Sequence, residues 1–273
     1  MRAVSSDFEE FKEFGMLKLF IFNLLVIAVI AVLLWVIKRQ VKCERGRNVV
    51  LILAAVATVL LHYSMLFYHC FCDTGLDYLK ENPNLILPIY PCNLVMWMAV
   101  IFGFYRSKSS RLGEFMADYI FWFGLISSLV GMFANVDFIM NPTFADFNIT
   151  KIVLAHGTLL FNILLLPVFG FVKIDMFRNM KNILFSIVMM LVTGLYCNLL
   201  FRALVSEEAA YDVNSMFLIH SPFEGIDFLT YPIIALISIP LYFGLFTVCE
   251  LIAKKKGERY YDRLASFLKK IKK

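Results

Sequence analysis

Charged residues are scarce in this sequence. Asp, Glu, Lys and Arg make up 17% of its 273 residues, whereas ordinary soluble domains carry about 25%. Apolar residues reach 60% and the mean hydropathy is +0.75. A soluble domain of this length keeps a large polar exterior, which this composition does not supply. The low charge therefore excludes a soluble enzyme, a nucleic-acid-binding module and a disordered chain, and it indicates that lipid is the solvent for most of the chain.

The sequence also lacks the patterns of several specialised sites. Its six cysteines indicate no disulfide framework, and Cys70 and Cys72, two residues apart in an external loop, are expected to be free thiols. Its four histidines contain no His-x-x-x-His pair of the kind that zinc-dependent membrane hydrolases use. His62 and His69 are seven residues apart on one helix face, a spacing that suits separate ligands better than one chelate. We therefore predict no metal and no other cofactor.

Seven apolar stretches are long enough to cross a bilayer, which takes about 20 residues. The sequence thus predicts an all-α, multi-pass membrane protein with seven transmembrane helices. Three parts follow along the chain: an external amphipathic segment (1–16), the transmembrane domain (17–252) and a basic amphipathic tail (253–273). The seven stretches are Leu17–Ile37, Val49–Tyr68, Leu85–Phe104, Met116–Phe133, Ile152–Val172, Ile183–Phe201 and Leu229–Ile252.

The basic residues predict the orientation of these helices. Twenty of the 26 Lys and Arg residues follow the first, third, fifth or seventh stretch. Because cytoplasmic loops carry the excess of Lys and Arg, the N-terminus is predicted outside and the C-terminus in the cytoplasm, most simply at the plasma membrane. Leu264, Phe267 and Ile271 recur at helical spacing among lysines of the tail, a pattern that favours binding to anionic lipid of the cytoplasmic leaflet. A plain topology anchor is the alternative for this tail.

The polar side chains of the spans gather at one depth. At 1.5 Å per residue, Cys92 and His156 lie roughly 7–11 Å below the outer boundary of the bilayer. His62 and Asn198 reach a similar depth from two other spans, while His69 lies at the surface. Polar groups inside hydrocarbon are costly and point to function, although an asparagine such as Asn198 also bonds neighbouring helices. Four helices thus deliver polar groups to one layer, as a site requires.

Cys92 has a special place in this layer because Pro91 precedes it. Proline is favoured at the first helical position, so Cys92 is predicted in the first turn of a helix, among unpaired backbone N–H groups. Those groups stabilise a thiolate and can also hold an oxyanion. An inert apolar filler is the ordinary alternative for a membrane cysteine. Burial opposes ionisation of the thiol, so a neighbouring histidine has to take its proton.

Two short motifs resemble the YwaF-like family of integral membrane proteins. They are Leu87–Leu94 (LPIYPCNL) and Leu154–Leu160 (LAHGTLL), and Val192–Asn198 (VTGLYCN) is similar to a later Gly…Asn helix of that family. Pro232 falls near the usual proline of its last span. The resemblance extends over roughly Val49–Ile252.

The eukaryotic members of that family look like membrane acyltransferases that act on glycerophospholipids. The resemblance implies that Cys92 accepts the acyl group and that His156 is its base. Tyr90 stands where the family has a further histidine. The role of that histidine is lost here or is taken by His62 or His69. A hydroxyl at Tyr90 still donates a hydrogen bond but is no base near neutral pH.

We therefore expect a lipid acyltransferase that uses Cys92 and His156 and passes through a thioester, with membrane lipids as donor and acceptor. The first-turn N–H groups near Cys92 and Asn93 hold the oxyanion, and Tyr90 or Asn198 orients the histidine or binds a headgroup. A lipid-ester hydrolase of the same fold is one alternative. A small-molecule transporter or receptor is another, although the sequence shows neither internal repeats nor mid-membrane charges. An inactive lipid-binding scaffold is the last; nucleic acid is not expected as a partner.

Overall fold

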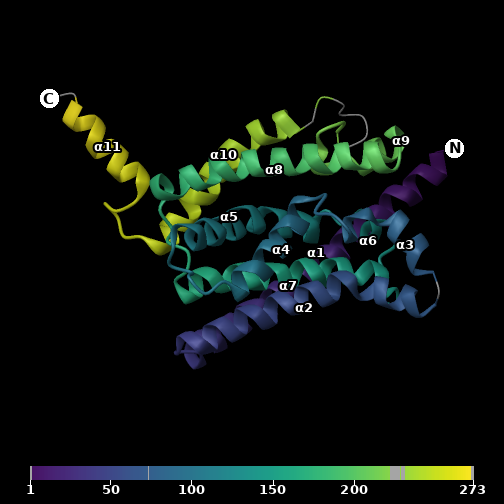
Figure 1. Cartoon of the computed structure of the whole chain (residues 1–273), viewed down its shortest axis with the longest axis horizontal. Coiled ribbons are helices and arrows are strands. Elements are labelled where there is room, and N and C mark those ends of the chain that lie inside the picture. The colour runs from purple at the N-terminus through teal and green to yellow at the C-terminus, as the bar shows by residue number, and fades with distance from the viewer. Residues whose placement is uncertain (1, 73, 222–227, 229–230, 272–273) are drawn as a thin grey trace. The chain divides into compact units, whose positions relative to one another are not determined.

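The chain folds into helices, as its apolar runs predict. The computed structural model describes residues 2–72, 74–221, 228 and 231–271, and the elements within these ranges are all helical. The chain divides into two compact units, Met1–Phe171 and Val172–Lys273. Figure 1 shows the helices of each unit.

The first unit is a bundle centred on its last long helix, α7. Helix α7 packs against α2 on one side and α5 on another, α4 lies against both α2 and α5, and α1 contacts α7 and α6 (Figure 1). Its elements are α1 (Arg2–Gln40), α2 (Glu44–Phe71), α3 (Gly75–Glu81), the short 3-10 helix η1 (Pro83–Leu85), α4 (Pro91–Phe104), α5 (Arg111–Phe133), α6 (Val136–Met140) and α7 (Phe147–Phe169).

Six described helices are long and apolar enough to cross a membrane, and the exception among the predicted spans is the third. Helix α4 has 14 residues, starting at Pro91 rather than at Leu85. Its length of about 21 Å is less than the roughly 30 Å of hydrocarbon. The reason is local, since Pro88 and Pro91 each lack an N–H and force the preceding residue out of the helical region. Helix α1 is continuous from Arg2, so residues 2–16 of the predicted external segment are helical and join the first span without a break.

The core of the first unit lies where α5 meets α4 and α7. Trp122, Tyr119 and Ile163 are almost completely buried there. In contrast to this buried core, the outward side chains of α1 are exposed: Leu25 is 61% exposed and Trp35 is 55% exposed. Apolar side chains on an outer surface fit contact with lipid.

The second unit holds the remaining helices. They are α8 (Met176–Leu204), α9 (Glu207–Val213), the 3-10 helix η2 (Ser215–Phe217), α10 (Tyr231–Ala253) and α11 (Tyr260–Ile271). The hairpin of α9 and η2 folds back on α8. Gly194 permits this close approach, because a Cβ there would lie 2.7–2.9 Å from side-chain atoms of Leu218 and Met216. The predicted sixth and seventh spans correspond to α8 and α10, although residues 229 and 230 lie outside the described part of the chain.

Candidate active site

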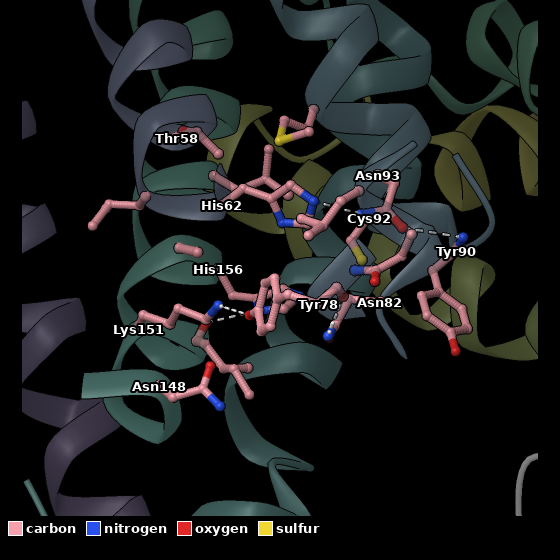
Figure 2. A pocket seen from close by; sticks show the side chains of 17 residues that line it. Thr58, His62, Tyr78, Asn82, Tyr90, Cys92, Asn93, Asn148, Lys151 and His156 are labelled. Carbon is pink, nitrogen blue, oxygen red and sulfur yellow. Dashed lines mark hydrogen bonds between the residues drawn. The ribbon is translucent and has the colours of Figure 1, made fainter. Parts of the chain in front are cut away.

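A cavity of about 310 Å³ lies within the first unit, between α2, α4 and α7 and beneath the α3–η1 segment. Figure 2 shows its side chains, with Thr58 at one end, Asn148 and Lys151 at the other, and His62, Cys92 and His156 between them. The lining residues are Thr58, Leu61, His62, Tyr78, Asn82, Asn84, Leu85, Tyr90, Cys92, Asn93, Met96, Asn148, Lys151, Ile152, Ala155, His156 and Leu159.

Five of the seven residues singled out in the sequence line this cavity. They are His62, Tyr90, Cys92, Asn93 and His156, which come from α2, α4, α7 and the residue before α4. Three of the four residues to which the sequence assigns one depth, His62, Cys92 and His156, therefore share a cavity.

Cys92 occupies the first turn of α4, as Pro91 predicts. Its sulfur lies beside the backbone N–H groups of Cys92 and of Asn93, and the Asn93 N–H also donates to the Tyr90 carbonyl at 3.1 Å. The side chain of Asn93 caps the turn, since its Oδ1 accepts the Tyr90 N–H at 3.2 Å. The turn thus presents two backbone donors at the sulfur, and such donors stabilise a thiolate or an adjacent oxyanion.

Polar groups lie on both sides of the His62 ring. The ring lies close to the backbone carbonyl of Asn84, and its Nε2 lies 3.5 Å from Asn93 Nδ2, an amide nitrogen that only donates. The same segment is fixed by Tyr63, whose hydroxyl donates to the Leu85 carbonyl at 2.6 Å. His62 therefore ties the α3–η1 segment to the first turn of α4.

His156 leaves one ring nitrogen available. Its Nδ1 donates to the carbonyl of Ile152, one turn earlier in α7, at 2.8 Å. This bond fixes the proton on Nδ1, so that Nε2 carries the lone pair of the neutral ring. The ring packs against Gly131 of α5, where a Cβ would lie 2.2 Å from Nε2. His156 is therefore the histidine of the cavity whose tautomer suits a general base.

The other two residues singled out in the sequence have different surroundings. His69 stacks on Tyr78, with ring centroids 4.2 Å apart, and so supports the cavity wall from behind. Asn198 belongs to the second unit, where its amide accepts from the Ser215 N–H at 2.8 Å and donates to the Ser215 carbonyl at 3.2 Å. Its side chain holds the α9–η2 hairpin on α8, a use that local sequence does not reveal.

Sequence reasoning missed the polar end of the cavity. Lys151, Tyr78 and Asn148 gather there, and Lys151 Nζ donates to Tyr78 Oη at 2.9 Å (Figure 2). A signal existed, because Lys151 directly precedes the predicted span Ile152–Val172, which carries His156. Within the described residues, no group of three or more His, Cys, Asp and Glu side chains is arranged to hold a metal ion.

Comparison with known proteins places the chain in a family. The model of the TMEM164 family matches residues 13–249, which include every residue that lines the cavity. Neither the curated proteins nor the solved structures contain a match. The finer resemblance to YwaF-like proteins and to acyltransferases stays a prediction. With its six long apolar helices and a match over most of its length, this multi-pass membrane protein belongs to the TMEM164 family.

Proposed function

We propose that the protein is a membrane-embedded acyltransferase that moves an acyl chain between lipids through a thioester on Cys92. The observation that carries this proposal is that Cys92 and His156 line one cavity, the first beside two backbone N–H donors and the second with its Nδ1 proton fixed. A nucleophile, a base and oxyanion donors are the groups that acyl transfer needs.

In the first half of the reaction, His156 Nε2 takes the proton of the Cys92 thiol. The thiolate attacks the carbonyl carbon of a lipid ester, and the oxyanion that forms is stabilised by the N–H groups of Cys92 and Asn93. The carbon–oxygen bond of the ester then breaks. The departing lysolipid oxygen takes the proton back from His156, and the acyl group remains on sulfur as a thioester.

The second half reverses these steps with a different alcohol. An acceptor hydroxyl gives its proton to His156 and attacks the thioester carbonyl, a new ester forms, and the sulfur leaves. The proton returns from His156 to sulfur, so the thiol is regenerated. No oxidant or other co-reactant is consumed.

The surroundings of the cavity favour a lipid substrate. Its walls come from helices of membrane-spanning character, α2 and α7, together with α4. Leu61, Met96 and Leu159 line it on those three helices and offer apolar surface to an acyl chain.

Two substitutions test the proposal. Cys92→Ala and His156→Ala are each expected to lower acyl transfer from a labelled phospholipid to a lysophospholipid by about 100-fold or more, because each removes a group that acts on the reacting atoms. Both variants are expected to keep the folded, detergent-extractable state. Cys70→Ala, which removes an exposed thiol of the chain, is the matched control and should keep full activity. Full activity in either active-site variant contradicts the proposal.

Product analysis in the same assay separates transfer from hydrolysis. Transfer moves the label into a second lipid, whereas a hydrolase of the same fold releases free fatty acid alone. Release of fatty acid with no labelled second lipid would assign water as the acceptor.

For the surroundings of the protein we propose the plasma membrane, with α11 on its anionic cytoplasmic surface. Leu264, Phe267 and Ile271 of α11 are 44–64% exposed, and Lys269 and Lys270 accompany them in its last turn. Such a helix lies in the interface plane, with apolar side chains inserted and lysines among the headgroups.

A further inference from the structure

The cavity is polarised along α7. The residues that α7 contributes recur at positions i, i+3, i+4, i+7, i+8 and i+11 and therefore form one face of the helix: Asn148, Lys151, Ile152, Ala155, His156 and Leu159. Polar side chains stand near the start of the helix, and apolar ones lie further along it. Thr58, at the apolar end, satisfies its own hydroxyl by donating to the Ala54 carbonyl at 2.9 Å. The cavity thus has the polarity of an amphiphile, with the proposed reacting groups in its middle.

The polar end holds the one charged side chain among the described residues that line the cavity. Lys151 has a hydroxyl partner, Tyr78 Oη at 2.9 Å, and no ion pair with any described residue. Tyr78 is itself held in place by its stack on His69. A cation in a partly closed, partly apolar cavity without a carboxylate beside it leaves a place for an external anion.

We propose that Lys151 and Tyr78 bind the phosphate of the lipid substrate and so place its ester at Cys92. This inference rests on the proposed function for the choice of a lipid. Lys151 precedes His156 by five residues, which is about 7.5 Å along the axis of α7. A phosphate and an ester on neighbouring carbons of glycerol are only a few bonds apart, a separation of the same order.

The chemistry favours an anion over a cationic or neutral group at this position. The ammonium of Lys151 and the hydroxyl of Tyr78 donate to phosphate oxygens, and charge-assisted bonds of this kind are stronger than neutral ones. The amides of Asn82, Asn84 and Asn148 also line the cavity and offer further polar groups to a headgroup. A cationic group would instead meet the ammonium with no carboxylate among the described lining residues to offset the repulsion.

Binding is measured on the full-length protein in detergent, with a lipid that has no ester to react. The probe is dialkyl ether phosphatidylglycerol, and the matching dialkylglycerol has the same chains without phosphate. Lys151→Met is expected to weaken binding of the phospholipid about tenfold and to leave dialkylglycerol binding unchanged. Lys151→Arg should keep most of the phospholipid affinity. Lys80→Met is the matched control, because Lys80 is an exposed lysine of α3 that pairs with Asp77.

Tyr78→Phe supplies a second variant in case Lys151→Met does not fold. It keeps the ring that stacks on His69 and removes only the hydroxyl, so it should weaken phospholipid binding several-fold. Unchanged phospholipid binding in a folded Lys151→Met protein overturns the inference. Inorganic phosphate is the second ligand: if it displaces the lipid with comparable affinity and the same dependence on Lys151, the anion is a soluble one and the lipid assignment is wrong.

These outcomes are separate from those that test the proposed chemistry. The binding assay requires no turnover, so Lys151→Met reports on the phosphate contact whether or not Cys92 is a nucleophile. If Cys92→Ala loses transfer and Lys151→Met binds phospholipid normally, the phosphate contact is refuted and the proposed chemistry stands. If Cys92→Ala keeps its transfer activity, the thioester route is refuted, and the binding result for Lys151 still stands by itself.

Discussion

The two histidines of the cavity differ in how their ring nitrogens are used. The His62 ring lies between two polar groups, the Asn84 carbonyl and the Asn93 amide, whereas His156 uses only Nδ1, which donates to the Ile152 carbonyl. Depth within a span does not distinguish these residues, but their partners do. The contrast suits His62 to holding the cavity and supports His156 as the proposed base.

The position of the His156 ring depends on a glycine in the neighbouring helix. Gly131→Ala would place a Cβ 2.2 Å from both Nε2 and Cδ2 of His156, so the ring has to move. We expect the rate of transfer to fall by about one to two orders of magnitude, because general-base catalysis depends on position. Extra volume of this kind costs about 1–3 kcal/mol of stability, so the fold should persist. The readouts are transfer rate, its pH profile and thermal unfolding.

Gly244→Ala is the control for this substitution. Apart from the local backbone of α10, no described atom lies within 4 Å of a Cβ at that position, and alanine favours a helix over glycine by about 1 kcal/mol. Its activity should be unchanged. An unaltered transfer rate and pH profile in Gly131→Ala would show that the ring is not held by α5.

At the scale of elements, one acidic residue before α8 fastens the C-terminal helix. Asp175 caps α8 by accepting the Arg178 N–H at 3.2 Å, and its other oxygen accepts from Lys254 and from Arg263, each at 3.0 Å. Glu250 of α10 is buried beside it and accepts from the Met176 N–H at 3.0 Å and from Lys254. The start of α8, the end of α10 and the start of α11 are thereby joined through charge.

The pH dependence of this junction follows from Asp175. Burial alone would raise the pKa of its carboxyl, but hydrogen bonds from Arg263 and Lys254 outweigh burial and hold the pKa at about 2. The ordinary value is about 3.9, so the stabilisation is complete above about pH 4 and disappears as the pH falls toward 2. Cleavage of the α11 segment by pepsin should therefore accelerate between pH 4 and pH 2.

Asp175→Asn should remove this stabilisation at neutral pH. We expect trypsin to cut the lysine-rich α11 segment several-fold faster than in the native protein at pH 7, and the acceleration between pH 4 and pH 2 to disappear. Asp77→Asn breaks an exposed ion pair with Lys80 and should change neither rate. Equal rates in Asp175→Asn and the native chain would mean that other contacts hold the helix.

At the scale of the whole molecule, the short helix α4 decides on which side of the membrane the two termini lie. If α4 crosses, the chain has seven spans and its termini lie on opposite sides; if it does not, the six long helices place both termini on one side. A helix of 14 residues is short for a span. Non-helical backbone within a membrane is nevertheless tolerated where it lines a cavity, as the segment before Pro91 does.

Thiol labelling tests this orientation, since Cys43, Cys70 and Cys72 are free and exposed. With the N-terminus outside, a membrane-impermeant reagent should label Cys70 and Cys72 on intact cells and Cys43 only after permeabilisation. In a chain without these three thiols, Ser109→Cys in the α4–α5 loop should also need permeabilisation. Labelling of Ser109→Cys on intact cells, together with labelling of Cys70 in the native chain on intact cells, would show that α4 does not cross.

The sequence by itself determined the class of protein, most of the spans and the helical turn that carries Cys92. These features are local: the hydropathy of a run of residues, or the missing N–H of Pro91, acts without regard to distant parts of the chain. The one predicted span that differs from the structure also has a local cause. The apolar composition of Leu85–Phe104 indicates a full span, whereas Pro88 and Pro91 within it indicate that the helix starts late.

Only the tertiary structure decided which polar residues meet. Lys151 and Tyr78 are in contact although they are 73 residues apart in the sequence, and His62 and Asn93 although they are 31 apart. Gly131 of α5 lies directly against the ring of His156 of α7. The sequence predicts Asn198 at the same depth as His62 and His156, but Asn198 bonds Ser215 in the second unit. Depth in a bilayer is a property of one helix, whereas contact depends on the rotation and packing of several. The sequence therefore determines the layer of a polar residue, and packing determines its neighbours.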